Sequence, residues 1–142
     1  MRIKRLNENA IIPTRADQGS AGYDLYVCCE DEVIIQPHET VMLSTGWAME
    51  IPYGHAGFIY ARSGLASKKG LAPANCVGVV DPSYRGEIKV ALHNYGTESQ
   101  IVHNGDRVAQ IVFHPYVCYD MNEVDEICST DRGDGGFGHT GD

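Results

Sequence analysis

Residues 75–92, NCVGVVDPSYRGEIKVAL, bring a carboxylate, an aromatic ring, a cation and a flexible backbone point together in one short stretch. These groups belong to Asp81, Tyr84, Arg85 and Gly86. At the mouth of a hairpin, such a set suits a small polar ligand. Asp and Pro are also common in solvent-exposed turns, so a solvated turn is the alternative reading of this stretch alone.

A second group of polar residues lies where a strand is expected to lead into a short helix. Arg62, Ser63 and Gly64 combine a cation, a hydroxyl and a backbone amide, which together can hold an anion such as phosphate. Ser63 has the alternative role of an N-cap, which is the commoner one. Further along the chain, Arg107 is predicted to be a structural ion-pair partner, with Asp24 as the candidate, ahead of direct ligand contact.

The C-terminal stretch from residue 129 to residue 142 differs from the rest in composition. Its only large apolar residue is Phe137, which lies among five glycines. Alone, this stretch cannot bury enough surface to order itself, but a mobile arm with one stacking ring and many free amides can close over a ligand. A frayed terminus is the alternative.

The elements that must position these groups are short strands. Residues 77–80 and 87–92 are predicted to fold back on each other, and the period-two alternation of the second run places Ile88, Val90 and Leu92 on a core face. Further hairpins are predicted between residues 33–35 and 40–45 and between residues 101–102 and 108–113. One short helix is expected over residues 65–69. Many short strands with almost no helix indicate a sandwich or barrel with jelly-roll-like connections.

Length and charge limit the classes of protein to which the chain can belong. Its 142 residues suffice for one domain with a moderate core. Eleven Lys and Arg against nineteen Asp and Glu give a net charge of -8, which leaves no general basic surface for nucleic acid. No apolar run reaches the roughly 18 residues of a spanning helix, and no signal peptide is recognisable. We therefore expect a cytoplasmic protein without nucleic-acid or membrane partners.

The sequence also lacks the patterns of several common active sites. Its five cysteines, Cys28, Cys29, Cys76, Cys118 and Cys128, show no C-x-x-C and no zinc-like spacing, and we expect them to be reduced thiols. No H-E-x-x-H, G-x-S-x-G, Walker or dinucleotide-binding sequence is present. Covalent catalysis through serine or cysteine is therefore not expected.

Taken in order, five stretches resemble the five motifs of the homotrimeric deoxyuridine triphosphate nucleotidohydrolases, the dUTPases. They are AGYDLY from Ala21, ARSGLASKKG from Ala61, NCVGVVDPSYRGEIKVAL from Asn75, GDRVAQIVF from Gly105 and RGDGGFGHTG from Arg132. Any one of them alone is a weak signal, whereas five in this order cover nearly the whole chain. The resemblance favours the functional reading of the turn at Asp81 over the solvated one.

The resemblance implies an all-β fold, a distorted jelly-roll-like β-barrel of the β-clip type. It also implies a homotrimer in which each active site is built from all three subunits. Residues 1–128 would form a single catalytic domain, and residues 129–142 a flexible glycine-rich arm that closes over a neighbouring active site.

The same resemblance assigns substrate contacts to individual residues. They are Arg62, Ser63, Gly64 and Gln110 for the phosphates, Asn75, Gly78, Tyr84 and Lys89 for the nucleoside, and Arg132, Phe137, Gly138 and Thr140 from the arm. Uracil would pair with backbone groups of the third motif, Tyr84 would pack against the deoxyribose, and Phe137 would stack over the base. The family often has serine where this chain has His139, so that hydroxyl contact does not carry over.

The reaction implied is hydrolysis of dUTP to dUMP and pyrophosphate, which limits uracil incorporation into DNA and supplies dUMP for dTTP synthesis. Asp81 would orient and deprotonate a water that attacks the α-phosphorus. Mg²⁺ is the expected cofactor, because a protein of net charge -8 repels a triphosphate unless cations neutralise it. In the family, this metal is held mainly by the phosphates and water molecules. The resemblance implies that Asp24 lies near it and contacts it through a water molecule.

Two other functions fit the same motifs. Deoxycytidine triphosphate deaminases share the fold, but they need a base-directed acid or base group that these motifs do not supply. A nucleotide-responsive interaction protein on the same scaffold is the alternative outside enzymes. The chain has no extra domain or long insertion for such a partner, so this would be an added role more than a replacement.

Overall fold

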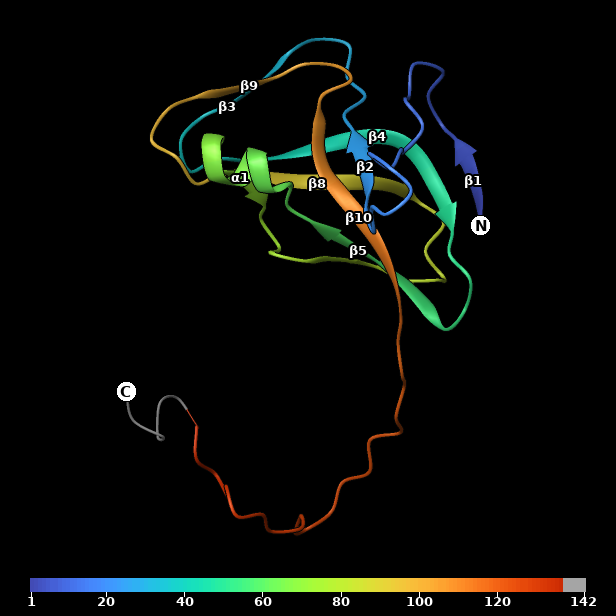
Figure 1. Ribbon diagram of the computed structural model, residues 1–142, viewed down its shortest axis with the longest axis vertical. Helices are drawn as coiled ribbons and strands as arrows, with labels where there is room; N and C mark the ends of the chain where they lie inside the picture. Colours follow the sequence, from blue (N-terminus) through green and yellow to red (C-terminus); the bar gives the residue numbers. More distant parts are fainter. Residues whose placement is uncertain (137–142) are drawn as a thin grey trace.

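The structure is a computed structural model that describes residues 1–136. Within these residues the chain forms ten strands and one short helix (Figure 1). In chain order they are β1 (Arg2–Arg5), β2 (Tyr23–Tyr26), β3 (Val33–Ile35), β4 (Thr40–Glu50), β5 (His55–Tyr60), α1 (Ser63–Lys69), β6 (Leu71–Pro73), β7 (Gly78–Val80), β8 (Glu87–Asn94), β9 (Gln100–Val102) and β10 (Arg107–Pro115). The all-β expectation is confirmed, and no helix of the described chain is long and apolar enough to cross a membrane.

Two four-stranded antiparallel sheets form the body of the molecule. Their strand orders are β1-β4-β8-β6 and β2-β10-β5-β7, and β3 pairs with β9 in a small third sheet. The chain crosses repeatedly between the two larger sheets, as the jelly-roll-like prediction requires. The predicted homotrimer concerns the assembly and stays a prediction.

The core lies between the two larger sheets. Leu25 and Ile111 come from one sheet, and Ile88, Val90 and Leu92 come from the other, each with at most 1% of its surface exposed. Burying such a side chain contributes about 1.5–3 kcal/mol. The period-two alternation predicted for residues 87–92 is therefore confirmed, and it fixes which face of β8 is left for the site.

The strands lie largely where the sequence predicted them, but the predicted hairpins are wrong. Strand β3 pairs with β9 and not with β4, and β9 and β10 lie in different sheets. Strand β7 pairs with β5, whereas β8 pairs with β4 and β6. The turns between these strands carry the chain from one sheet to another, and the same turn residues serve both kinds of connection.

The short helix α1 begins directly after Arg62 and ends at Lys69, where Gly70 caps it. Gly70 adopts a left-handed conformation with φ of 64°, and its N–H donates to the Ala66 carbonyl at 3.1 Å. Arg62, which has an extended backbone, occupies the N-cap position. Ser63 is the first helical residue, so the alternative reading of Ser63 as an N-cap is wrong.

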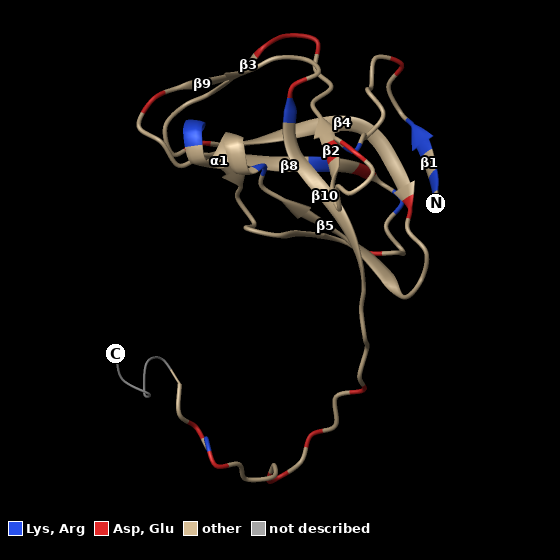
Figure 2. Ribbon diagram, in the orientation of Figure 1, with Lys and Arg blue, Asp and Glu red and all other residues tan. Residues whose placement is uncertain are grey.

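After β10 the chain leaves the sandwich and runs away from it as an extended segment without strand or helix up to residue 136 (Figure 1). Large apolar side chains on this segment are exposed, for example Val117 and Met121. Acidic side chains are spread along it (Figure 2). Strand β10 ends at Pro115, and the N–H of Tyr116 still donates to the Gly54 carbonyl at 3.1 Å. The domain boundary at residue 128 and the closing of an arm over a neighbouring site stay predictions.

Candidate active site

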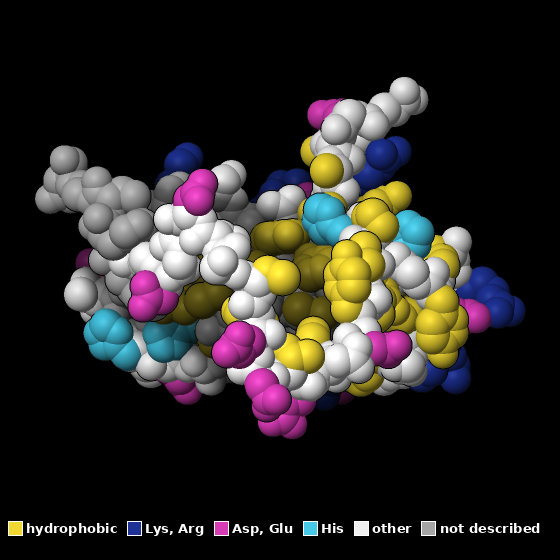
Figure 3. Space-filling model, turned by 90° about the horizontal axis from the view of Figure 1, so that it is seen from below, with side chains coloured by type: hydrophobic (Ala, Val, Ile, Leu, Met, Phe, Trp, Pro, Cys, Tyr) yellow, Lys and Arg dark blue, Asp and Glu magenta, His cyan; other side chains and the backbone are white. Residues whose placement is uncertain are grey.

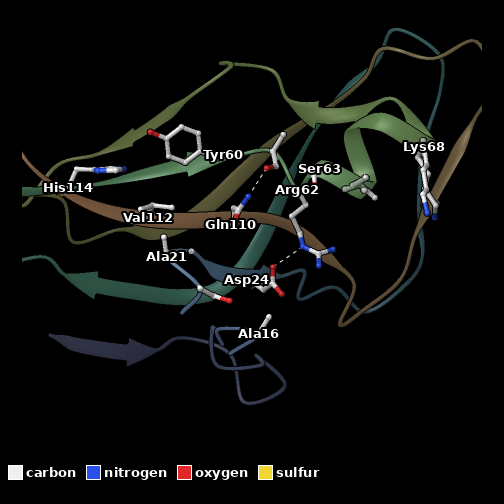
Figure 4. A pocket seen from close by; sticks show the side chains of 16 residues that line it. Ala16, Ala21, Asp24, Tyr60, Arg62, Ser63, Lys68, Gln110, Val112 and His114 are labelled. Carbon is white, nitrogen blue, oxygen red and sulfur yellow. Dashed lines mark hydrogen bonds and ion pairs between the residues drawn. The ribbon is translucent and has the colours of Figure 1, made fainter. Parts of the chain in front are cut away.

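A large open cavity of about 970 Å³ lies beside β2, β10 and the start of α1 (Figure 4). Five residues singled out from the sequence line it: Asp24, Arg62, Ser63, Gly64 and Gln110. They come from the first, second and fourth motifs, which the fold places side by side because β2 pairs with β10 and β5 leads into α1. This arrangement concentrates hydrogen-bond donors along one wall.

An ion-pair network of three residues holds the side chain of Arg62 in this cavity. The Nε atom of Arg62 donates to Oδ1 of Asp24 at 2.7 Å, and Nη1 of Arg107 donates to Oδ2 at 3.2 Å. The side chain of Asp24 is only 13% exposed. The predicted pair between Arg107 and Asp24 is therefore confirmed, and Asp24 also aligns Arg62.

The two ion pairs of Asp24 affect whether this residue can bind the expected Mg²⁺. Both carboxylate oxygens of Asp24 already accept hydrogen bonds from guanidinium groups, whose positive charge opposes a cation at the same place. Within residues 1–136, no group of three or more His, Cys, Asp or Glu side chains is placed to hold a metal. The described residues thus do not fit a protein-held Mg²⁺, and a water-mediated contact from Asp24 stays a prediction.

Two further groups in the cavity are held by the backbone. Nε2 of Gln110 donates to the Ala61 carbonyl at 3.0 Å, and a Cβ atom added at Gly22 would come within 2.5 Å of Oε1 of Gln110. Gly22 therefore leaves the space that the Gln110 amide occupies. The first hydrogen bonds of α1 run from the N–H groups of Leu65 and Ala66 to the Arg62 carbonyl. The N–H groups of Ser63 and Gly64 come before these bonds in the helix.

The sequence reasoning missed two lysines in this cavity. Lys68 and Lys69, in the last turn of α1, line the same cavity as Arg62. A usable signal was available, because Leu65, Lys68 and Lys69 have i, i+3, i+4 spacing and so share one face of the helix. Together with Arg62 they add positive charge opposite the wall of β2 and β10.

A separate hollow of about 210 Å³ lies beside β7, the following turn and the start of β8. The predicted residues of the third motif all line it: Asn75, Gly78, Asp81, Tyr84 and Lys89. The side chain of Asn75 packs against Gly78, where an added Cβ would lie 3.0 Å from Nδ2. Among residues 1–136, none lines both this hollow and the large cavity.

Hydrogen bonds hold the turn between β7 and β8 in shape. The N–H of Tyr84 donates to the Asp81 carbonyl at 3.1 Å, and its hydroxyl donates to the Glu87 carbonyl at 2.9 Å. The guanidinium of Arg85 donates to the carbonyls of Pro82 and Tyr84 and lines a different hollow. The expectation that Arg85 faces the same ligand as Asp81 is therefore not supported.

Arg132, from the described part of the fifth motif, lines neither the large cavity nor the smaller hollow. Arg132 belongs to the extended C-terminal segment, where its Nε donates to the Gly135 carbonyl at 2.8 Å. This segment runs away from the sandwich (Figure 1). The predicted contacts of Phe137, Gly138 and Thr140, and the position of His139, lie outside the described residues.

Two cysteines of the sandwich, Cys28 and Cys29, are held in the thiol form by their surroundings. Burial, with a smaller effect from the charge of Glu87, raises the pKa of the Cys28 thiol above its ordinary value. Burial also raises the pKa of Cys29, helped by Cys28 and nearby carboxylates. A raised pKa favours the protonated thiol, which is a weaker nucleophile than the thiolate.

One face of the molecule carries exposed apolar surface. Hydrophobic side chains gather around a hollow on the face seen in Figure 3. By strand register, Val79 lies opposite Phe58 and Phe58 opposite Val112, all on the outer side of the sheet β2-β10-β5-β7. An outer sheet face of this kind is typical of an interaction surface.

Comparison with known proteins agrees with this arrangement. The family model described as dUTPase matches residues 8–141. The deoxyuridine 5'-triphosphate nucleotidohydrolase of Hydrogenobaculum sp. (strain Y04AAS1) is 45% identical over 139 residues, covering 98% of this chain and 96% of the relative. The protein of the same name from Desulfitobacterium hafniense (strain DSM 10664 / DCB-2) is 49% identical over 131 residues, covering 92% and 87%.

Solved structures give the same result. A structure of Staphylococcus bacteriophage 80alpha dUTPase with dUPNHPP has a TM-score of 0.89 and 27% identity, and covers 99% of this chain and 97% of its own. A mutant dUTPase from phage phi11 of S. aureus, whose structure describes the coordination of a structural Mg(II) ion, has a TM-score of 0.81 and 25% identity, covering 90% and 98%. The motifs, the fold and these relatives agree, and the chain belongs to the dUTPase family.

Proposed function

We propose that this chain hydrolyses dUTP to dUMP and pyrophosphate, which keeps uracil out of DNA and supplies dUMP for dTTP synthesis. One observation carries the proposal. In a member of the dUTPase family, every described residue of the first four motifs to which the resemblance assigns a contact or a catalytic role lines one of two hollows, and one of these is rich in groups that bind anions. We place the reaction in the cytoplasm, where five free cysteines remain reduced.

The large cavity suits the triphosphate. A triphosphate carries about four negative charges, and a chain of net charge -8 must neutralise them locally. Arg62 with the nearby Lys68 and Lys69 supplies cations, and the first amides of α1 and the Gln110 side chain supply neutral donors. Mg²⁺ enters this scheme as part of the substrate, bound to phosphate oxygens and water.

The smaller hollow suits the nucleoside. Backbone groups near Asn75 and Lys89 would pair with uracil and leave cytosine with unpaired buried groups. The Tyr84 ring, held by the hydroxyl contact to Glu87, would lie against the deoxyribose. A ribose 2′-hydroxyl would then find neither room nor a partner, which costs about 1–3 kcal/mol. Phe137 from the arm would stack over the base.

Asp81 is the proposed general base. Its carboxylate lines the nucleoside hollow and is exposed to solvent, so it can hold a water beside a bound nucleotide. Asp81 takes a proton from that water as its oxygen bonds to the α-phosphorus. The bond from the α-phosphorus to the bridging oxygen breaks, and pyrophosphate leaves with those electrons. Arg62 and the amides beside it stabilise the charge that develops on the phosphates.

A complete site requires more than one copy of the chain. The phosphate-binding residues, Asp81 with its neighbours, and Arg132 on the extended segment occupy three separate places in one chain. We propose a homotrimer in which each site takes these three sets from different subunits. The apolar outer face at Phe58 and Val79 would lie in such an interface.

A pyrophosphate-release assay with Mg²⁺ tests the function. Purified protein is given dUTP, dCTP, dTTP and UTP in separate reactions, and ammonia is measured in the dCTP reaction. We expect rapid release of pyrophosphate from dUTP and release slower by at least about 10²-fold from the other three. Ammonia from dCTP, or no turnover of dUTP, would contradict the proposal.

A further inference from the structure

We infer that Gly86 is a positioning residue for sugar selectivity, because it leaves the space in which the ring of Tyr84 lies. The inference rests on the proposed function and extends it to a residue that has no side chain of its own to contact the substrate. Gly86 follows Tyr84 by two positions in the turn between β7 and β8. The turn brings the ring back over the main chain at this point.

The ring of Tyr84 is in close contact with the backbone at Gly86. A Cβ atom added at Gly86 would lie 2.6 Å from Cζ and 3.0 Å from Cε2 of the ring, and closer still to the hydroxyl oxygen. Carbon atoms prefer to be about 3.5–4.0 Å apart, so any side chain here would move the ring by about 1 Å. That movement would also draw the hydroxyl away from the Glu87 carbonyl.

The backbone conformation at residue 86 does not explain why a glycine is present there. The φ angle of Gly86 is not among the positive values in residues 1–136, so an alanine could adopt the same backbone there without strain. Gly86 is exposed, and the side chain of Tyr84 is 46% exposed, so the ring has solvent to move into. A substitution at Gly86 is therefore expected to displace the ring without unfolding the sandwich.

A displaced ring changes how the hollow receives the sugar. Tyr84 lines the hollow together with Asp81 and Asn75, so a shift of about 1 Å changes the space beside a bound nucleoside. Exclusion of a 2′-hydroxyl depends on that space being filled. Uracil recognition is less affected, because the Asn75 side chain packs against Gly78, whereas the nearest atoms to an added Cβ at Gly86 all belong to Tyr84.

The test compares Gly86→Ala, Tyr84→Ala and the double variant. The specificity ratio, kcat/KM for dUTP divided by that for UTP, is measured for each full-length protein, together with Tm. We expect Gly86→Ala to lower the ratio at least tenfold with little change in Tm. Because Gly86 acts through the ring, adding Gly86→Ala to Tyr84→Ala should change neither the ratio nor Tm any further.

Two glycine variants serve as controls. Gly78→Ala would disturb Asn75 and not Tyr84, so it should lower kcat/KM for dUTP and UTP by the same factor. Gly19→Ala, whose Cβ would meet only the Asp17 carboxylate at 3.3 Å, should behave as the unsubstituted protein.

An unchanged ratio in Gly86→Ala would overturn the inference. So would a further fall of the ratio or of Tm when Gly86→Ala is added to Tyr84→Ala, since the added methyl group would then act on something other than the ring. Failure of the unsubstituted protein to hydrolyse dUTP is a different result and would overturn the proposed function instead.

Discussion

Replacing Asp24 by Asn removes the charge that aligns Arg62 while keeping the shape of the side chain. The side-chain oxygen of an asparagine can accept a hydrogen bond from one guanidinium group. Its NH₂ group then points at the other guanidinium group, and two donors cannot form a hydrogen bond with each other. A hydrogen bond to a charged group contributes about 1.5–3 kcal/mol net. The Arg107 side chain is about half exposed, so its pair with Asp24 adds little.

The loss from Asp24→Asn should therefore be about 1.5–3 kcal/mol, mainly from Arg62. For a chain of this size that corresponds to a fall in Tm of about 5–10 °C. Because Arg62 is no longer held at the phosphate cavity, the KM for dUTP should rise about tenfold, an order-of-magnitude estimate for one lost charged contact. The Mg²⁺ concentration that gives half-maximal activity should change by less than the KM does, because the predicted contact between Asp24 and the metal runs through water.

Thermal unfolding and steady-state kinetics over a range of Mg²⁺ concentrations measure both effects. Glu50→Gln is the matched control, since it removes a carboxylate paired with Arg2 at 2.6 Å on the exposed surface and should leave Tm nearly unchanged. An unchanged Tm in Asp24→Asn, or a higher Mg²⁺ requirement at constant KM, would refute the positioning role and favour a metal role for Asp24.

Three further outcomes are expected. Asp81→Asn should lower kcat by about 10² to 10⁴ while a non-hydrolysable dUTP analogue binds within a few-fold of its original Kd, and unchanged turnover would remove Asp81 as the base. Tyr84→Ala should raise kcat/KM for UTP relative to dUTP, and an unaltered preference in competition assays would exclude the ring from sugar selection. Chelation of Mg²⁺ by EDTA should stop turnover but leave the Tm of the nucleotide-free protein unchanged, because residues 1–136 contain no cluster of side chains that could hold a metal ion. A large fall in Tm would indicate a protein-held ion.

Sequence patterns predicted the strands well, because strand formation and burial follow local alternation. The run from Glu87 to Leu92 illustrates this, since Ile88, Val90 and Leu92 all face the core. Strand partners were not predictable in the same way. The residues at turns such as 36–39 and 103–106 fit a tight hairpin and a crossover between sheets equally well, and only the packing of the two sheets decides between them.

The candidate site shows the same division. The types and spacing of Arg62, Asp81 and Tyr84 indicated sites for a phosphate and a small polar ligand but left a solvated turn open, and the family resemblance supplied their roles. The bonding of both Asp24 oxygens to arginines depends on the register of β2 against β10, which the sequence does not encode locally. The distribution of the motifs over two unconnected hollows likewise depends on strands that are distant in the chain.

The shared site is tested most directly by mixing inactive subunits. Chains carrying Arg62→Ala and chains carrying Asp81→Asn are produced separately and together, and mixed trimers are verified by native mass spectrometry. If each site takes Arg62 from one subunit and Asp81 from its neighbour, every mixed trimer has one intact site, and random mixing restores about one quarter of the original kcat. Mixed trimers no more active than the two parents would contradict a site built from different subunits.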